Sequence, residues 1–135
     1  MNPVNQTTNR FCGPAVLSII TGIDTGEAER LIQDVRHTSR SIKGAYLHEL
    51  CTILQQRGYK TEYLNYLEKT VFRFLFEEKR DGTYLVTVSG HFVCFERENN
   101  DWKVCDNHTK TPLKASRSAR LMQKIISVIR VELKK

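Results

Sequence analysis

Apolar residues in the first part of the chain recur every three or four positions, which is the spacing of helices with one buried face. The first of these segments is apolar on most of its sides, so it is expected to be the buried central helix. Asp24 followed by Glu27 is typical of a helix start, and Gly22 and Gly58 are typical of helix ends. Together these signals predict helices over residues 13–21, 24–36, 45–57 and 69–79.

The second half of the chain changes to an alternation of apolar and polar residues, which is typical of half-buried strands. Strands are predicted over residues 60–64, 83–97 with a break at Ser89-Gly90, 102–106 and 128–133, and a fifth helix over 116–124. The Asn99-Asn100 pair predicts a β-hairpin, because asparagine tolerates the positive φ angles of tight turns. Helices followed by antiparallel strands indicate the α+β fold class.

The composition is that of an ordinary folded domain. The 135 residues are 40% hydrophobic and 27% charged, so we expect a single domain over 1–135 with its own core. A net charge of +6 would suit nucleic acid. However, the lysines and arginines are scattered, and the densest basic stretch, 114–135, is interleaved with apolar residues. A nucleic-acid footprint is a clustered patch, so no nucleic-acid partner is expected.

Cellular location and thiol state follow from what the sequence lacks. The N-terminus has no apolar stretch of the kind found in signal peptides, and no segment is long and apolar enough to span a membrane. We therefore expect a cytoplasmic monomer that does not enter a membrane, with its four cysteines reduced. Nothing in the sequence calls for a cofactor.

A possible nucleophile lies where the first helix begins. Cys12 precedes Gly13-Pro14 and the apolar helix, so its thiol would feel the positive end of the helix dipole, which favours the reactive thiolate. Gln6 could donate to an oxyanion together with the Cys12 backbone N–H. An isolated cysteine is more often a packing residue, so the interpretation depends on a base elsewhere in the chain.

His91, at the start of a predicted strand, is the candidate base. If the hairpin is centred on Asn99-Asn100, Cys94 pairs with Cys105, and Asp106 shares a face with His91. A carboxylate there would orient the imidazole and favour its charged form. A register shift of one residue would bring Asn107 to this position instead.

These residues resemble the motifs of a known family. Three stretches carry the likeness: Gln6 with Cys12-Gly13-Pro14-Ala15-Val16-Leu17, residues 82–93 ending in Ser89-Gly90-His91-Phe92-Val93, and Trp102-Lys103-Val104-Cys105-Asp106. Their order resembles the papain-like cysteine peptidases, and most closely the small bacterial and phage branch related to the bacteriocin-leader, or double-glycine, peptidases. The resemblance implies a papain-like fold with the nucleophile at a helix N-terminus packed on an antiparallel sheet.

The same resemblance implies a peptidase that hydrolyses peptide or isopeptide bonds. The nucleophile would be Cys12, the base His91, its orienting acid Asp106, and the oxyanion donor Gln6. The small residues Gly13 and Gly90 would let the backbone of a protein or peptide substrate approach, and the polar loop 37–44 is a candidate border of the groove.

Three alternatives remain open. The same residues serve thiol acyltransferases, transglutaminases and deamidases, because these enzymes share the thioester-type intermediate. A catalytically inactive relative that only binds is the second. The third is a zinc site of His91, Cys94, Cys105 and His108, but regular strands would point the members of each pair to opposite faces, so no metal is expected.

Overall fold

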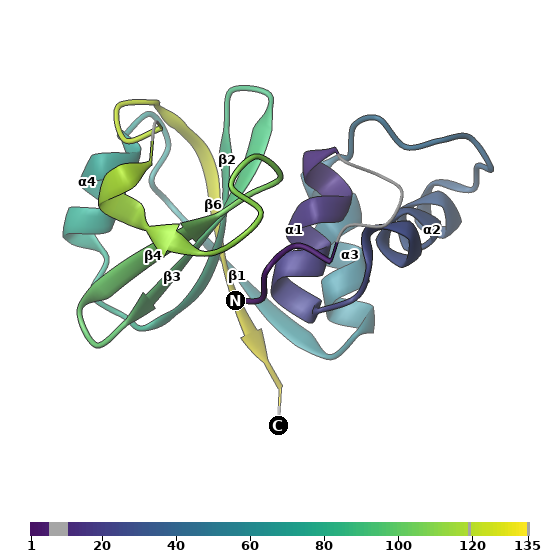
Figure 1. Ribbon diagram of the computed structural model, residues 1–135, viewed down its shortest axis with the longest axis horizontal. Helices are drawn as coiled ribbons and strands as arrows, with labels where there is room; N and C mark the ends of the chain where they lie inside the picture. The colour runs from purple at the N-terminus through teal and green to yellow at the C-terminus, as the bar shows by residue number, and fades with distance from the viewer. Residues whose placement is uncertain (6–10, 119, 135) are drawn as a thin grey trace.

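A six-stranded antiparallel sheet forms the centre of the computed structural model, which describes residues 1–5, 11–118 and 120–134. In spatial order its strands are β1 (Tyr59–Leu64), β6 (Ile125–Leu133), β2 (Gly82–Val88), β3 (His91–Glu98), β4 (Asp101–Cys105) and β5 (Leu113–Lys114). The helices α1 (Cys12–Thr21), α2 (Thr25–Arg36) and α3 (Leu47–Gln56) lie on one side of the sheet, and the short α4 (Val71–Glu77) lies on the other (Figure 1). The α+β class expected from the sequence is confirmed.

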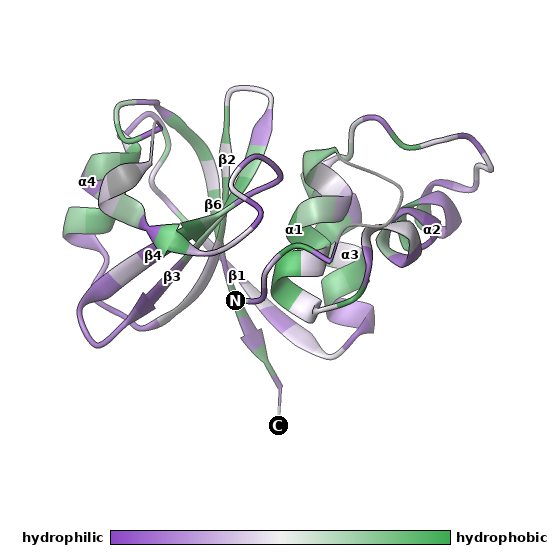
Figure 2. Cartoon of the chain, viewed as in Figure 1, coloured by the Kyte–Doolittle hydropathy of each residue, from purple (hydrophilic) through white to green (hydrophobic). Residues whose placement is uncertain are grey.

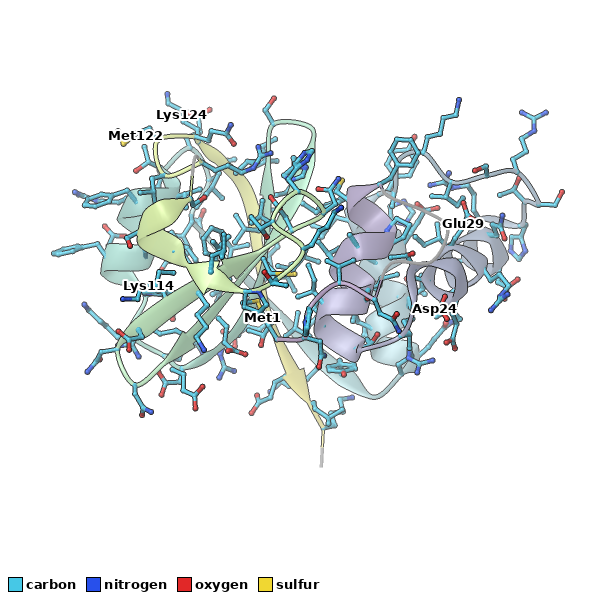
Figure 3. The ribbon with its side chains drawn as sticks, in the orientation of Figure 1. Met1, Asp24, Glu29, Lys114, Met122 and Lys124 are labelled. Carbon is cyan, nitrogen blue, oxygen red and sulfur yellow. The ribbon has the colours of Figure 1, made fainter. Side chains whose placement is uncertain are left out.

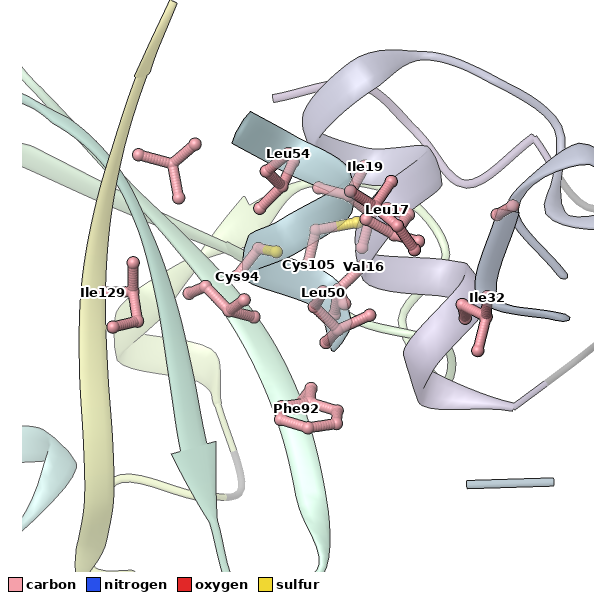
Figure 4. Close-up of a cluster of buried hydrophobic side chains, with 14 of the residues drawn as sticks. Val16, Leu17, Ile19, Ile32, Leu50, Leu54, Phe92, Cys94, Cys105 and Ile129 are labelled. Atoms are coloured by element: carbon pink, nitrogen blue, oxygen red, sulfur yellow. The ribbon is translucent and has the colours of Figure 1, made fainter. Parts of the chain in front are cut away.

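An apolar core lies on each face of the sheet. On one face, Val16, Leu17 and Leu50 from the helices meet Phe92 and Ile129 from the strands (Figure 4). On the other face, the second core is built around aromatic side chains of α4 and the strands: Phe74, Tyr84, Phe95 and Trp102. The first core fixes where the start of α1 lies against the sheet.

The helices α1 and α2 begin and end within one residue of their predicted bounds, whereas α3 and α4 are shorter than the predicted 45–57 and 69–79. The Asp24 side chain accepts from the Glu27 N–H at 2.9 Å, and Gly22 ends α1 with a φ of 84°. Figure 2 shows α1 as apolar along most of its length and α2 as mostly polar, in keeping with a central and a peripheral helix. Among the helices of the described residues, none combines the length and the apolarity that crossing a membrane requires.

The two hairpins fix the strand register. Asn99 and Asn100 both have positive φ angles, and Cys94 pairs with Cys105, which confirms the predicted register. Ser89-Gly90 connects β2 to β3, so that Val88 pairs with His91. His91 therefore begins β3 directly after a tight turn, at the end of the sheet.

The predicted fifth helix over 116–124 is wrong. The chain forms a short 3-10 turn, η1 (Ala115–Arg117), and residues 120–124 then run along the start of α4. The carbonyl of Leu121 accepts from the Phe72 N–H at 2.8 Å, and that of Gln123 accepts from the Val71 N–H at 3.0 Å. These tertiary hydrogen bonds hold residues 121 and 123 against the N–H groups at the start of α4, which have no acceptor within that helix, and they outweigh the weak intrinsic helix preference of the segment.

Candidate active site

Cys12 is the first residue of α1 and is half-buried. The helix starts there because Phe11 has extended backbone angles and its carbonyl accepts the Ala15 N–H at 3.1 Å. The N–H groups of the first helical turn have no acceptor within the helix, so they are available to an anion beside the thiol. The N-terminal segment holds α1 in place, because the Asn5 N–H donates to Ser18 Oγ at 2.8 Å.

His91 and Asp106 meet at the neighbouring end of the sheet. Nε2 of His91 lies 3.0 Å from Oδ2 of Asp106, and the two side chains are 10% and 5% exposed. The other carboxylate oxygen accepts the backbone N–H groups of His108 and Thr109, each at 2.9 Å. The sequence prediction that Asp106 lies beside His91 therefore matches the structure.

The His91 ring also bonds the Cys12 thiol, so the three side chains form one chain of contacts. With Nε2 directed at Asp106, Nδ1 is the ring nitrogen left for the sulfur. Burial acts to raise the pKa of Cys12. Hydrogen bonds from the His91 side chain and the Phe92 backbone, together with the imidazolium charge, outweigh it, and the pKa of Cys12 is lowered. The site therefore favours a thiolate.

The two partners of this thiolate are also held in their charged forms. Burial acts to lower the pKa of His91, but hydrogen bonds to Asp106 and Cys12 outweigh it, and the pKa is raised. For Asp106, burial acts to raise the pKa. The hydrogen bonds from His91 and from the backbone of Thr109 and His108 prevail, and the Asp106 pKa lies well below its usual range. An ionised acid therefore supports a charged imidazole beside the thiol.

A cleft of about 650 Å³ opens beside Cys12 and His91. Residues 43–47 form its wall on the helical side, and Thr87, Gly90–Phe92 and Ile126–Ser127 form its wall on the sheet side. The helical wall is fixed because Arg36 binds the buried Glu49 with two hydrogen bonds, of 2.7 and 2.9 Å, and also donates to the Gly44 carbonyl. The cleft is large enough for an extended segment of a few residues.

The two glycines assigned to substrate binding have different surroundings. Gly90 lines the cleft and has a φ of 65°, with nothing within 4 Å of the place where a Cβ would stand. Gly13 instead is buried, and an added Cβ would lie 2.7 Å from Cβ of Ala45. The expectation that Gly13 leaves room for a substrate is therefore corrected: its missing side chain lets α1 pack against residue 45.

Sequence reasoning overlooked two residues that the fold brings to the acid. Nε of Arg120 lies 3.6 Å from Oδ2 of Asp106, and the His108 ring stacks on the His91 ring with centroids 5.4 Å apart. His108 was considered only as a zinc ligand. For Arg120 the sequence carried no signal, because the contact depends on the course of the chain after β5. Gln6, the predicted oxyanion donor, lies outside the described residues.

The zinc alternative gains no support. Over the described ranges, no three histidine, cysteine or acidic side chains are grouped as metal ligands. Cys94 and Cys105 are fully buried in the core between the helices and the sheet, and burial raises the pKa of Cys105 to about 11. His91 faces Asp106 and Cys12 instead.

No model of a known protein family matches the chain, and no curated protein sequence matches it. Several solved structures, however, match the chain. The peptidase domain of Streptococcus ComA, a bi-functional ABC transporter involved in a quorum-sensing pathway, is 16% identical with a TM-score of 0.61, and the match covers 98% of each chain. A double-glycine-motif protease from an AMS/PCAT transporter, solved in complex with its leader peptide, is 11% identical with a TM-score of 0.63. That match covers 99% of this chain and 93% of the other.

The peptidase domain of Streptococcus mutans ComA is 18% identical over 97% of this chain and 98% of its own, with a TM-score of 0.50. Identities this low establish an architecture and leave the chemistry to be argued from the site. The helices on one face and the antiparallel sheet have the arrangement seen in these peptidase domains: the chain has their papain-like fold.

Proposed function

We propose that the protein is a cysteine peptidase that cleaves peptide bonds in the cleft beside Cys12. The observation that carries the proposal is the chain of contacts from the Cys12 thiol through His91 to Asp106, at a helix N-terminus that opens into that cleft. Burial raises the pKa values of Cys51 and Cys94, whereas the pKa of Cys12 is lowered although it too is partly buried. The fold shared with known peptidase domains supports the same conclusion.

In the proposed reaction, the Cys12 thiolate attacks the carbonyl carbon of the scissile bond. Gln6 and the Cys12 backbone N–H stabilise the oxyanion, and each such donor is typically worth about 3–4 kcal/mol in the transition state. As the C–N bond breaks, the proton on His91 Nδ1 moves to the leaving amine, and an acyl group remains on the sulfur. His91 then takes a proton from water, the resulting hydroxide displaces the thiolate, and the peptide acid is released.

The proposed substrate is an extended peptide segment. Its backbone would pass Gly90, where the absence of a side chain leaves space at the sheet wall of the cleft. One structural neighbour has been solved with a leader peptide, which supports a peptide as the ligand of this fold. Peptides in this cleft would lie between the sheet and residues 43–47, the segment that Arg36 and Glu49 hold in place.

Cleavage of a proteome-derived peptide library tests the proposal. New N-termini should appear with the parent protein and disappear with Cys12→Ala. Cys51→Ala is the matched control, because Cys51 is also half-buried but lies away from the cleft. Cleavage that survives Cys12→Ala would refute the proposal. A peptidase should form its products with water as the only acyl acceptor. Products that appear only when hydroxylamine is added as an acceptor would indicate an acyltransferase.

Gln6→Ala tests the oxyanion donor separately. We expect kcat to fall by about 10²–10³-fold with little change in KM, since the donor acts only in the transition state. Alkylation of Cys12 by iodoacetamide should be unchanged, because that reaction forms no oxyanion. An unchanged kcat would remove Gln6 from the mechanism.

We further propose that the protein acts as a cytoplasmic monomer, without nucleic acid and without a cofactor. Light scattering coupled to size-exclusion chromatography checks the first of these points. A mass near twice the 15.7 kDa of the chain would contradict it.

A further inference from the structure

The acid of the proposed site has a second cationic neighbour. Oδ2 of Asp106 faces His91 Nε2 at 3.0 Å and Arg120 Nε at 3.6 Å, whereas Oδ1 is taken by two backbone N–H groups. The Arg120 side chain is 22% exposed and the Asp106 side chain 5%. A partly buried ion pair is screened less by salt than a fully exposed one. Arg120 and His91 therefore share one carboxylate oxygen.

Arg120 is held in this position by the chain around it. Its backbone N–H donates to Ser118 Oγ at 3.1 Å, and its Nη1 donates to Gln123 Oε1 at 3.2 Å. The following residues are fixed to the start of α4 through the Leu121 and Gln123 carbonyls. The side chains of Met122 and Lys124 project outward from the same segment, as Figure 3 shows, and its inward contacts are made by Arg120, by Leu121 against the second core, and by backbone groups.

Four charged or titratable groups meet around the His91 imidazole. They are Cys12 from α1, Asp106 and His108 from the segment after β4, and Arg120 from the segment before β6. Lys43 lies on the opposite wall of the cleft and is exposed. Arg120 is the second cation that contacts the acid, after the imidazole itself, and its charge acts to lower the pKa of His91 against the effect of Asp106.

We propose that Arg120 is a positioning residue of the active site, holding Asp106 ionised and in place while offsetting part of the acid's hold on the His91 proton. This proposal rests on the proposed peptidase function. The proton on His91 has two opposing requirements: it must stay on the ring while the thiolate is waiting, and it must leave for the amine when the C–N bond breaks. A general acid works best when its pKa lies near the working pH. The positive charge of Arg120 beside the shared carboxylate oxygen weakens the hold of Asp106 on that proton.

Titration of His91 by NMR tests this directly. Histidine-labelled protein in a Cys12→Ala background avoids a coupled titration with the thiol. We expect Arg120→Gln and Arg120→Met to raise the His91 pKa by roughly one unit, because each removes a nearby cation. Arg120→Lys keeps the charge, so the His91 pKa in this variant should stay close to that of the parent protein. Arg73→Gln removes the same charge from an exposed ion pair on α4 and is the matched control.

A second readout uses the Cys12-containing protein. The high-pH limb of the kcat/KM profile should move upward in Arg120→Gln and return toward the parent profile in Arg120→Lys. If Arg120 only packs, replacing it would change neither the His91 pKa nor the high-pH limb of the kcat/KM profile. The proposal is overturned if His91 titrates alike in the parent and both neutral variants, or if Arg73→Gln produces the same shift. Since the titration needs no substrate, its result is separate from whether the library is cleaved.

Discussion

The carboxylate of Asp106 shows how one side chain sets the charge of a site. Its two oxygens face two backbone N–H groups, an imidazole and a guanidinium, so the negative form is stabilised although the side chain is buried. Removing the charge would leave these donors without an ionised acceptor, which is costly in a buried position. The consequences should be visible in stability as well as in activity.

Asp106→Asn should lower the free energy of unfolding by about 1–3 kcal/mol. The pKa of Asp106 is lower in the folded protein than in the unfolded chain, where it is about 3.9. Its contribution to the free energy of unfolding is therefore fully present above about pH 3.9 and fades as the pH falls below that value. The pKa of His91 is higher in the folded protein than in the unfolded chain, where it is about 6.5. Its contribution to the free energy of unfolding is therefore complete below about pH 6.5 and fades as the pH rises through the folded pKa. The difference from the parent should therefore be largest between about pH 4 and pH 6.5.

Urea denaturation over a range of pH measures this difference. Asp101→Asn, at an exposed acid on the other end of β4, is the control and should change little. If Asp106→Asn lowers the free energy of unfolding by the same amount from acid to alkaline pH, stability is not linked to the titration of Asp106 and His91.

At the level of helices and strands, sequence reasoning worked wherever local patterns decide the outcome. The Asn99-Asn100 turn sets the register of β3 and β4, and that register alone brings Asp106 beside His91. Prediction from the sequence failed where contacts with distant segments outweigh local preferences. The predicted helix over 116–124 is replaced by the short η1 and by residues 120–124, which are held along the start of α4 through the carbonyls of Leu121 and Gln123. Gly13 proved to be a packing residue because Ala45, thirty-two positions later, occupies the adjacent space, which no local pattern could reveal.

Gly13→Ala should destabilise the protein by about 1–3 kcal/mol, because the new methyl group would overlap Ala45. Adding Ala45→Gly should recover much of the loss, and this non-additivity is the signature of a direct contact. Gly44→Ala is the matched control, since nothing lies within 4 Å of its added Cβ. Denaturation midpoints of Gly13→Ala, Ala45→Gly, the double variant and Gly44→Ala decide the matter: a double variant whose loss of stability equals the sum of the two single losses would refute the contact.

The sheet wall of the cleft carries two buried hydroxyl groups on paired residues. Oγ1 of Thr87 and Oγ of Ser127 are hidden from solvent, and neither has a hydrogen-bond partner within the described part of the chain. Thr87→Val keeps the shape and removes one unsatisfied group, so it should be neutral or stabilise the fold by up to about 1 kcal/mol. Thr83→Val on the same strand is the comparison. A clear loss of stability in thermal unfolding of Thr87→Val would show that the hydroxyl has a partner after all.

Across the whole molecule, the site is assembled from segments far apart in the sequence. Cys12 comes from the helical side, His91 and Asp106 from the sheet, and Arg120 from the segment that crosses to α4. The N-terminal segment joins these parts, because the Val4 N–H donates to the Lys110 carbonyl at 2.7 Å and the Thr25 N–H donates to the Asn5 carbonyl at 2.8 Å. The sequence could predict Cys12, His91 and Asp106 from motif order and register. Arg120 escaped prediction because its place depends on this tertiary path.

The pH dependence of iodoacetamide alkylation tests whether His91 activates the Cys12 thiol. The other cysteines are internal references: burial raises the pKa values of Cys51, Cys94 and Cys105, so they should react slowly in the folded protein. Cys12 should react fastest and remain reactive well below the pKa of about 8.5 of a free thiol. In His91→Ala its rate should fall and follow an ordinary thiol titration. If Cys12 of the parent protein already titrates near 8.5 and His91→Ala leaves its rate unchanged, the thiol is not activated and the peptidase proposal fails.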